Sequence, residues 1–291
     1  MNALPAALNA ALAAATGGTF VLRAARRAGG GSINEAWVLQ GEDRSYFVKV
    51  HARSEALFRA EARALDALAA TATLRVPRPV AQGTSGDLAF LVLEYLPLQT
   101  QGDAARLGRT LAALHRTHSD RYGWEEDNYI GRTPQPNGWM ADWVEFWRVR
   151  RLGPQLDLAR ARGSRRLVAA GEKLLARLPQ LFDGHTPPPA LLHGDLWGGN
   201  YGYATGGEPV IFDPAAYYGD REAELAMTEL FGGFPAAFYA AYREAWPLDE
   251  GYRVRKTLYN LYHVLNHDHM FGDSYGAQAL AMMDALSAEL G

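Results

Sequence analysis

A short β-prone island at residues 190–214 interrupts a C-terminal half that otherwise has helical periodicity. Its two apolar runs are Ala190-Leu191-Leu192-His193 and Pro209-Val210-Ile211-Phe212, and polar residues follow each run at once. Around the island, the sequence predicts helices over 103–118, 139–151, 164–182, 221–231, 235–245, 251–270 and 275–290. The chain must therefore present a small strand-rich segment between helices.

The first 96 residues have a different hydrophobic pattern, in which predicted strands dominate. Runs at 19–22, 36–39, 46–50 and 88–95 predict strands, and residues 54–70 predict a helix with Ser54 as its N-cap. A stripe of Leu4, Leu8 and Leu12 predicts a docked amphipathic helix at the start. The pattern indicates an α+β, bilobal protein. A β-rich N-terminal lobe spans 1–96, and a mostly helical C-terminal lobe spans 97–291.

Composition excludes several classes of function. Basic and acidic residues number 29 and 32, giving a net charge of −3, which argues against a nucleic-acid partner or a polybasic membrane anchor. No run of 18 apolar residues exists, so we expect no membrane partner. The absence of cysteine excludes disulfides, thiolate metal sites and a cysteine nucleophile, and it fits a reducing compartment. The first 16 residues lack the charged start of a signal peptide, and we expect a cytoplasmic protein.

Lysine is scarce, since only Lys49, Lys173 and Lys256 are present. Lys49 lies in a predicted strand, and a solvent-exposed edge lysine is the simpler interpretation. On the next helix, however, Glu61 projects into an apolar stripe of leucines and alanine. A carboxylate on a packed face needs a partner. The sequence therefore predicts a Lys49–Glu61 ion pair like the one that positions nucleotide phosphates in kinase-like folds.

A glycine-rich stretch lies between the first two predicted strands: Gly29, Gly30, Gly31, Ser32, Ile33 and Asn34. A flexible hairpin turn is the simpler interpretation of a triple glycine. It does not match the dinucleotide fingerprint, and the absence of any Gly-Lys dipeptide excludes a Walker A loop. A hairpin of this kind can still cover phosphates with its backbone N–H groups.

The most specific pattern is His193-Gly194-Asp195, with Asn200 five residues after the aspartate and Asp213 thirteen residues later. Phosphoryl transfer needs a carboxylate that orients the attacking hydroxyl and accepts its proton. It also needs hard oxygen ligands for Mg²⁺. The order and spacing match a kinase catalytic loop followed by a metal-binding aspartate.

Several longer strings resemble the fructosamine kinase (ketosamine-3-kinase) family, within the aminoglycoside/choline kinase-like branch of the protein-kinase-like fold. The similarity extends from about Gly29 to Leu286. One difference is Ser32, where the family often has a cysteine, so thiol-based control of that loop is absent. The strings are Asp127-Asn-Tyr-Ile-Gly131, Pro134-Gln-Pro-Asn137, Arg151-Leu-Gly-Pro-Gln-Leu156, His193-Gly-Asp-Leu-Trp197, Asp213-Pro-Ala215, Tyr218-Gly-Asp-Arg-Glu222, Glu229-Leu-Phe-Gly-Gly-Phe234 and Leu261-Tyr-His-Val-Leu-Asn-His267.

The resemblance implies a role for individual residues. Asp195 would be the catalytic base, Asn200 and Asp213 would hold Mg²⁺, and Trp197 would wall the acceptor site. The residues expected to bind ATP are Gly29, Gly30, Gly31, Ser32, Asn34, Lys49, Glu61 and the hinge Glu94-Tyr95-Leu96.

Other polar residues have two interpretations. Four residues, Asp220, Arg221, Glu222 and Glu224, fit either a solvated helix N-terminus or a role in the acceptor site. The cluster of His263, His267 and His269 fits hydrogen-bonded pocket histidines better than a zinc site. His115 fits a structural histidine, and Trp139, Trp143 and Trp147 fit a packing stripe.

The resemblance implies an ATP- and Mg²⁺-dependent kinase that phosphorylates the 3-hydroxyl of ketosamines, the adducts of sugars with amines. The phosphate would favour loss of the sugar, so the role would be deglycation repair. The partner would be a small-molecule or protein-bound ketosamine. The alternatives are another alcohol kinase of the aminoglycoside/choline class and, with the catalytic pattern intact, less readily a dead nucleotide-binding scaffold. The preferred sugar, the carrier and the oligomeric state stay open.

Overall fold

The computed structural model of the protein describes residues 3–29, 35–272 and 274–291. The chain divides into two compact units. The first comprises Met1–Asp103 with Gly199–Pro214, and the second comprises Ala104–Gly198 with Ala215–Gly291. This division differs from a single cut after residue 96, because a hairpin from the predicted β-prone island packs within the first unit.

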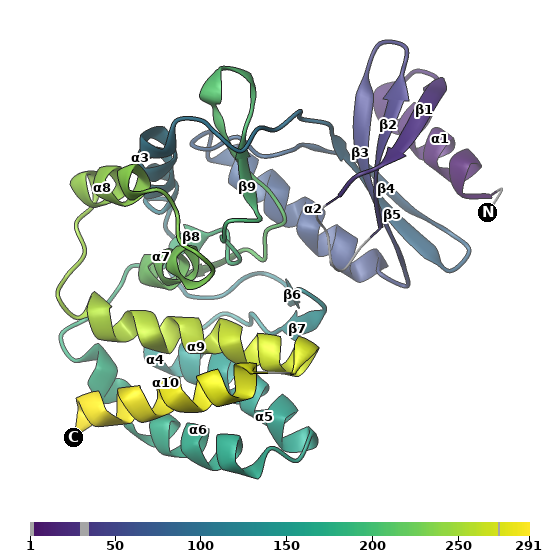
Figure 1. The fold of residues 1–291 in the computed structure, drawn as a ribbon. Helices are drawn as coiled ribbons and strands as arrows, with labels where there is room; N and C mark the ends of the chain where they lie inside the picture. The colour runs from purple at the N-terminus through teal and green to yellow at the C-terminus, as the bar shows by residue number, and fades with distance from the viewer. Residues whose placement is uncertain (1–2, 30–34, 273) are drawn as a thin grey trace. The chain divides into compact units, whose positions relative to one another are not determined.

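The first unit is built on a five-stranded antiparallel sheet with the strand order β1-β2-β3-β5-β4 (Figure 1). Two helices accompany the sheet, α1 (Ala3–Thr16) and α2 (Glu55–Ala70). The strands are β1 (Leu22–Arg27), β2 (Glu35–Gly41), β3 (Ser45–Ala52), β4 (Pro79–Ser85) and β5 (Leu88–Glu94).

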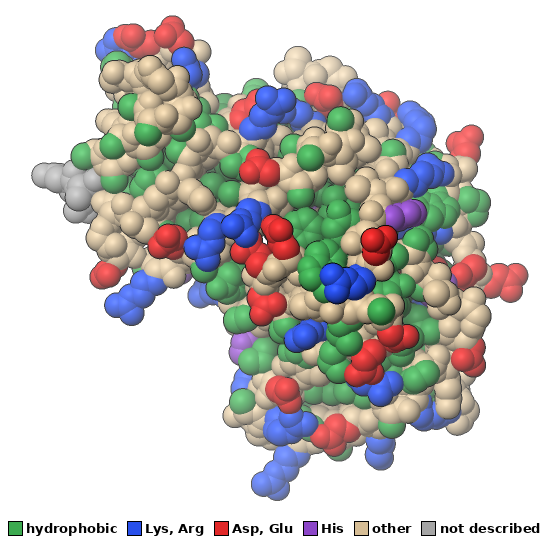
Figure 2. Space-filling model, turned by 180° about the vertical axis from the view of Figure 1, so that it is seen from behind, with side chains coloured by type: hydrophobic (Ala, Val, Ile, Leu, Met, Phe, Trp, Pro, Cys, Tyr) green, Lys and Arg blue, Asp and Glu red, His purple; other side chains and the backbone are tan. Residues whose placement is uncertain are grey.

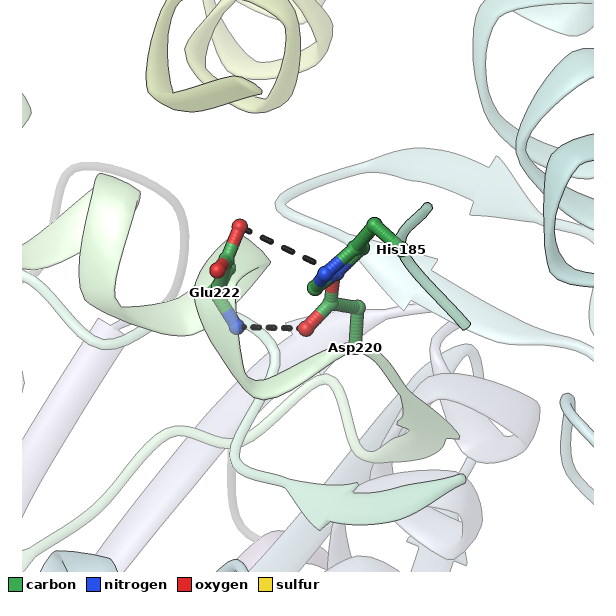
Figure 3. Close-up of side chains that lie close together, drawn as sticks. All are labelled: His185, Asp220 and Glu222. Atoms are coloured by element: carbon green, nitrogen blue, oxygen red, sulfur yellow. Dashed lines mark hydrogen bonds and ion pairs between the residues drawn. The ribbon is translucent and has the colours of Figure 1, made fainter. Parts of the chain in front are cut away.

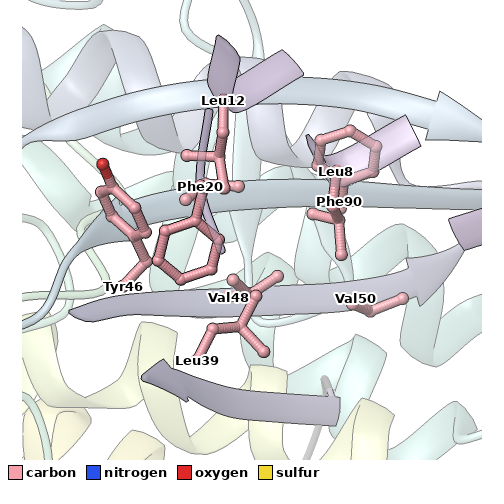
Figure 4. Packing of buried hydrophobic residues seen from close by; sticks show 9 residues of the cluster. Leu8, Leu12, Phe20, Leu39, Tyr46, Val48, Val50 and Phe90 are labelled. Atoms are coloured by element: carbon pink, nitrogen blue, oxygen red, sulfur yellow. The ribbon is translucent and has the colours of Figure 1, made fainter. Parts of the chain in front are cut away.

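The two faces of β3 contact different helices, because side chains alternate along a strand. Tyr46, Val48 and Val50 pack with Leu8 and Leu12 of α1 in one apolar cluster (Figure 4). Lys49, between them in sequence, points the other way and contacts α2. The predicted amphipathic α1 is confirmed, and burying its leucines leaves the opposite face of β3 for a charged side chain.

A hairpin of β9 (Tyr201–Tyr203) and β10 (Pro209–Ile211) completes the first unit, with a 3₁₀ turn at Thr205–Gly207 between them. Backbone contacts attach it to the rest of the unit. Tyr203 bridges to Gln99, the Asp103 N–H donates to the Gly207 carbonyl at 3.3 Å, and the Ile211 N–H donates to the Arg75 carbonyl at 3.0 Å. The hairpin delivers the two polar positions that flank it, 200 and 213, to the first unit.

The second unit is mostly helical. Two short antiparallel pairs, β8 with β11 and β6 with β7, lie among its helices. The strands are β6 (Asn128–Ile130), β7 (Thr133–Gln135), β8 (Ala190–Leu192) and β11 (Tyr217–Gly219). The helices are α3 (Ala104–Leu114), α4 (Trp143–Phe146), the π-helix Trp147–Leu152, α5 (Gly153–Ala161), α6 (Arg165–Arg177), the 3₁₀ helix Leu178–Phe182, α7 (Arg221–Leu230), α8 (Ala236–Ala245), α9 (Tyr252–Phe271) and α10 (Tyr275–Leu290).

Most predicted elements occur near their expected bounds, and three differ. The strand expected at 19–22 lies at Leu22–Arg27. The helix expected over 139–151 begins at Trp143 and passes through the π-helix into α5, which sequence reasoning missed. Pro154, which lacks an N–H donor, lies where the π-helix ends and α5 begins. Ser54 precedes α2, but its hydroxyl bonds to His51 and Ala52 rather than capping the helix.

The predicted tryptophan stripe is a packing element. Trp143 and Trp147 are buried, with ring centroids 5.4 Å apart, and Trp139 packs on Tyr218. Within the described residues, no helix has the length and apolar character needed to cross a membrane. On the face in Figure 2, basic and acidic side chains are interspersed.

Candidate active site

The ammonium group of Lys49 lies between two carboxylates in the first unit. Its Nζ is 2.6 Å from Oε1 of Glu61 on α2 and 2.6 Å from Oδ1 of Asp213. Lys49 and Glu61 are only 5% and 7% exposed, whereas the Asp213 side chain is 45% exposed. The helical period that placed Glu61 inward therefore predicted its position correctly, and the ion pair is present.

Charge balance keeps Lys49 protonated. Burial alone would lower the pKa of Lys49, but the nearby carboxylates of Asp213 and Glu61 outweigh burial and raise it. Two carboxylates face this one ammonium, and the Asp213 side chain is the more exposed of the two. An exposed carboxylate supplies the oxygen ligands that a hard cation such as Mg²⁺ prefers.

The β9–β10 hairpin brings Asn200 close to the residues that lead into Asp213. Tyr201 pairs with Ile211, and just beyond that pair the Phe212 N–H donates to the Asn200 carbonyl at 3.0 Å. Asn200 is buried, and Asp213 has a left-handed backbone conformation with φ of 60°. Two predicted metal ligands thirteen residues apart in sequence thus flank the same end of one hairpin.

The predicted hinge follows β5. The Glu94 N–H donates to the Arg78 carbonyl at 2.8 Å, and the Glu94 carboxylate binds the Arg75 guanidinium. Tyr95 accepts a hydrogen bond from Arg26 at 2.8 Å, and Leu96 is half-buried. The Glu94 N–H therefore already donates a hydrogen bond within the protein. Of the hinge positions, the N–H groups of Tyr95 and Leu96 are the better candidates for contacting adenine.

Of the glycine-rich stretch, Gly29 lies within the described residues. Gly29 follows β1 and is exposed. Gly30, Gly31, Ser32 and Asn34 lie outside the described residues, and their expected role stays a prediction.

The predicted catalytic loop lies in the second unit, directly after the buried strand β8. Asp195 is half-buried, and its backbone N–H faces Nδ1 of His193 at 3.3 Å. Gly194 has a φ of 84°, and a Cβ there would approach the Ala215 carbonyl oxygen to 2.1 Å. The position accepts only glycine, which explains the His-Gly-Asp sequence.

Trp197, two residues beyond Asp195, is 37% exposed. It makes an edge contact with Phe231 at a centroid distance of 6.2 Å, and Phe231 packs on His267 at 4.8 Å. An exposed indole beside the loop provides the flat apolar surface that the acceptor hypothesis requires.

The late histidines have hydrogen-bonding and packing roles. His267 Nδ1 lies 2.8 Å from the His263 carbonyl, and burial lowers the pKa of His263 to about 3. The three histidines do not form a candidate metal cluster within the described residues, where the group with suitable spacing is His185, Asp220 and Glu222.

Asp220 and Glu222 occupy a buried polar network at the start of α7 (Figure 3). Asp220 accepts hydrogen bonds from Tyr259 at 2.5 Å and from the Glu222 N–H at 2.9 Å, and it contacts His185 at 2.7 Å. Glu222 binds Arg255 through both carboxylate oxygens, at 2.7 and 3.0 Å.

Both carboxylates are only 1% exposed, so they are not a solvated helix terminus. Their expected place in the acceptor site stays a prediction. Because protein groups enclose their oxygens, direct contact with an acceptor is not part of the function proposed below. The partners Arg255 and His185 were missed, since no local pattern links them to α7.

The fructosamine kinase family profile matches residues 5–289 of this chain. The chain belongs to the fructosamine kinase family. A probable ketoamine kinase of Synechocystis is 48% identical over 272 residues, covering 92% of each chain. A rice protein-ribulosamine 3-kinase is 43% identical over 88% of this chain and 76% of its own.

Solved structures agree with the family and the fold. A structure from Haemophilus somnus assigned as a fructosamine-3-kinase superposes with a TM-score of 0.88 at 31% identity, over 96% of both chains. An aminoglycoside phosphotransferase superposes with a TM-score of 0.60 at 17% identity over 97% of this chain and 99% of its own, which shows the fold alone. The predicted α+β, kinase-like fold and the predicted family are confirmed.

Replacing Lys49 by arginine should abolish nucleotide-dependent turnover. The guanidinium is longer and planar, and the buried space between Glu61 and Asp213 holds a compact ammonium. We expect at least about a 100-fold loss of kcat/KM for ATP, since a misplacement of ~1 Å costs this much. Lys173→Arg on the exposed surface of α6 is the matched control. Steady-state kinetics on both variants tests this, and a Lys49→Arg enzyme with normal kcat/KM would contradict it.

The His185 network should stabilise the fold more at low pH. Burial alone would lower the pKa of His185, but the hydrogen bond to Asp220 and the charges of Asp220 and Glu222 outweigh burial and the opposing charge of Arg255, so the pKa is raised above 6.5. The stabilisation is complete below pH 6.5 and is lost as the pH rises through the higher folded-state pKa. Thermal unfolding should be measured between pH 5.5 and 8.5. The melting temperature of wild type should exceed that of His185→Gln, and this difference should become smaller at alkaline pH. A constant difference would rule out the titration.

Proposed function

We propose that this protein is an ATP- and Mg²⁺-dependent ketosamine 3-kinase that acts in deglycation repair. Family membership together with the Lys49–Glu61–Asp213 geometry supports this assignment most strongly. The names of its relatives, ketoamine kinase and protein-ribulosamine 3-kinase, point to ketosamines as acceptors. A cytoplasmic location is part of the proposal, consistent with the absence of cysteine.

In the first unit, the chain's own residues would bind and orient the nucleotide. Glu61 fixes the rotamer of Lys49, whose ammonium would contact the α- and β-phosphates. The exposed Asp213 carboxylate and the amide oxygen of Asn200 would hold Mg²⁺. Bound Mg²⁺ neutralises charge on the phosphate oxygens of ATP. The backbone after β5 would meet the adenine.

In the second unit, Asp195 would act as the general base. It accepts the proton of the 3-hydroxyl while that oxygen bonds to the γ-phosphorus of ATP and the bond to the departing ADP breaks. Trp197 would contact the sugar chain and the neighbouring secondary amine, which is cationic near neutral pH. The resulting 3-phosphate favours spontaneous loss of the sugar from the amine.

A coupled ADP-release assay over a panel of acceptors tests the function. We expect much higher kcat/KM for ribulosamine, erythrulosamine and fructosamine adducts of lysine than for free lysine or free sugars, which lack one half of the acceptor. Asp195→Asn is the control and should lower kcat by about 10²- to 10⁴-fold while leaving ATP binding intact. If the protein phosphorylated choline or kanamycin but no ketosamine, this proposal would be wrong and the protein would be another alcohol kinase.

Replacing Trp197 by alanine should weaken binding of the acceptor but not binding of the nucleotide. Losing a cation–π contact of about 0.5–2 kcal/mol corresponds to a rise of roughly 2- to 30-fold in KM for the ketosamine. The KM for ATP should stay within about twofold. Trp139→Ala, which removes a half-buried indole packed on Tyr218, is the control and should change neither KM. Equal rises in both constants for Trp197→Ala would assign it a structural role.

A further inference from the structure

The predicted hinge is linked to the β9–β10 hairpin through Arg75, on the segment between α2 and β4. The Arg75 guanidinium binds Oε1 of Glu94, the first hinge residue. The Arg75 carbonyl accepts a hydrogen bond from the Ile211 N–H of β10 at 3.0 Å, and residue 75 also forms a parallel bridge with Val210. One residue therefore contacts the hinge through its side chain and the hairpin through its backbone.

The ion pair at the hinge is partly enclosed, and its carboxylate has a second donor. The side chains of Arg75 and Glu94 are 27% and 31% exposed. The other carboxylate oxygen of Glu94 accepts a hydrogen bond from the Arg78 N–H at 3.3 Å. Leu74 and Val76, which flank Arg75, are buried, so packing fixes its backbone. A fully exposed ion pair contributes little, but a carboxylate held by two donors in a packed segment has less freedom to move.

The chain beyond the hinge holds the other strand of the hairpin. Gln99 and Tyr203 of β9 exchange two backbone hydrogen bonds, at 2.8 and 2.9 Å. β9 in turn pairs with β10 along its whole length. These contacts form a closed ring, which runs from Glu94 along the chain to Gln99, across both strands of the hairpin, and back to Glu94 through Arg75.

The ring of contacts has one side-chain link, the Arg75–Glu94 ion pair, and its other links are made by backbone. The two residues expected to hold Mg²⁺ flank the hairpin within it: Asn200 directly precedes β9, and Asp213 lies two residues after β10. Because the ring is closed, the hinge backbone and these two positions cannot shift independently while the ion pair is intact.

We propose that Arg75 is a positioning residue that couples nucleobase contact at the hinge to the two residues expected to hold Mg²⁺. Its guanidinium fixes the hinge through Glu94, and its carbonyl fixes β10 and therefore Asp213. The adenine end and the phosphate end of a bound nucleotide are thus held in one frame. The nucleotide part of this inference rests on the proposed function, whereas the ring of contacts is a property of the fold that can be measured without an acceptor.

Hydrogen exchange on the full-length wild type tests the coupling without any substitution. The Ile211 N–H donates to Arg75, so its exchange reports that contact directly. Saturating adenosine, which has a base but no phosphate, should slow exchange in a peptide covering 209–212 by about twofold or more. Exchange in α10 should stay unchanged. Slower exchange confined to residues 93–97 would contradict the coupling.

Calorimetric titration of ADP with and without Mg²⁺ provides the second measurement. The ratio of the two dissociation constants is the gain in affinity that Mg²⁺ supplies. Glu94→Gln should reduce this gain by at least about fivefold, a usual size for coupling between two sites, although Glu94 is not among the residues expected to hold the metal. If ADP binding weakened equally with and without Mg²⁺, Glu94 would act on the hinge alone and the inference would be overturned.

A double-mutant cycle identifies Arg75 as the link. Arg75→Met, Glu94→Gln and the double variant should reduce the Mg²⁺ gain to the same extent, because losing either side chain opens the ring. Arg23→Met is the matched control, since it removes an exposed ion pair with Glu42 from the same unit, and its gain should stay within about twofold of wild type. Losses that add in the double variant, or an equal loss in Arg23→Met, would overturn the inference.

The measurements separate the possible failures. A wild type that shows the expected coupling but phosphorylates no ketosamine would retain the inference and refute the proposed acceptor. A wild type that binds neither adenosine nor ADP would refute the proposed function, and exchange in the nucleotide-free protein would then decide whether the ring exists. Glu94→Gln should accelerate exchange at 209–212 by at least about fivefold while β3 keeps its rate. Unchanged exchange at 209–212 in that variant would overturn the inference.

Discussion

The first unit depends on keeping one ammonium group charged in a nearly dry position. Lys49 retains its proton because Glu61 and Asp213 both lie 2.6 Å away. Each partner requires a different part of the unit. The sheet must present β3 with Lys49 on the face opposite α1, α2 must turn Glu61 inward, and the β9–β10 hairpin must return the chain to deliver Asp213. Removing either carboxylate would leave the buried Lys49 ammonium with a single charged partner.

Sequence reasoning predicted those parts of the site that local periodicity or spacing determines. Glu61 was located by the 100° helical repeat, and the Asn200–Asp213 pair by its order after a β-prone run. The first succeeded because the constraint lies within one helix and the preceding strand, and the metal-binding role of Asn200 and Asp213 stays a prediction. The fold followed from the same pattern, apart from α5 and the strands β4, β6, β7, β9 and β11. β4 contains Gln, Gly and Ser in place of an apolar run, and α5 begins at Gly153 with a proline directly after it.

The parts that sequence reasoning missed are partnerships between distant segments. Glu222 finds Arg255 33 residues away, and Glu224 finds His115 109 residues away. No local pattern marks such pairs, because a charged residue near a helix N-terminus is favoured there even when solvent surrounds it. What distinguishes the two cases is burial, and burial is decided by how α7 packs against α9 and beside β8.

The start of α7 shows how three acidic residues in five positions take separate roles. Asp220 caps the helix through the Glu222 N–H, Glu222 neutralises Arg255, and Glu224 turns to the catalytic loop. Burying three carboxylates close together costs free energy unless each has its own donors. That requirement explains why this region also contains Arg255, His185, His115 and Tyr259, all largely enclosed. The polar network that secures the fold and the one that secures the loop therefore share one short helix, so the orientation of α7 fixes the loop backbone.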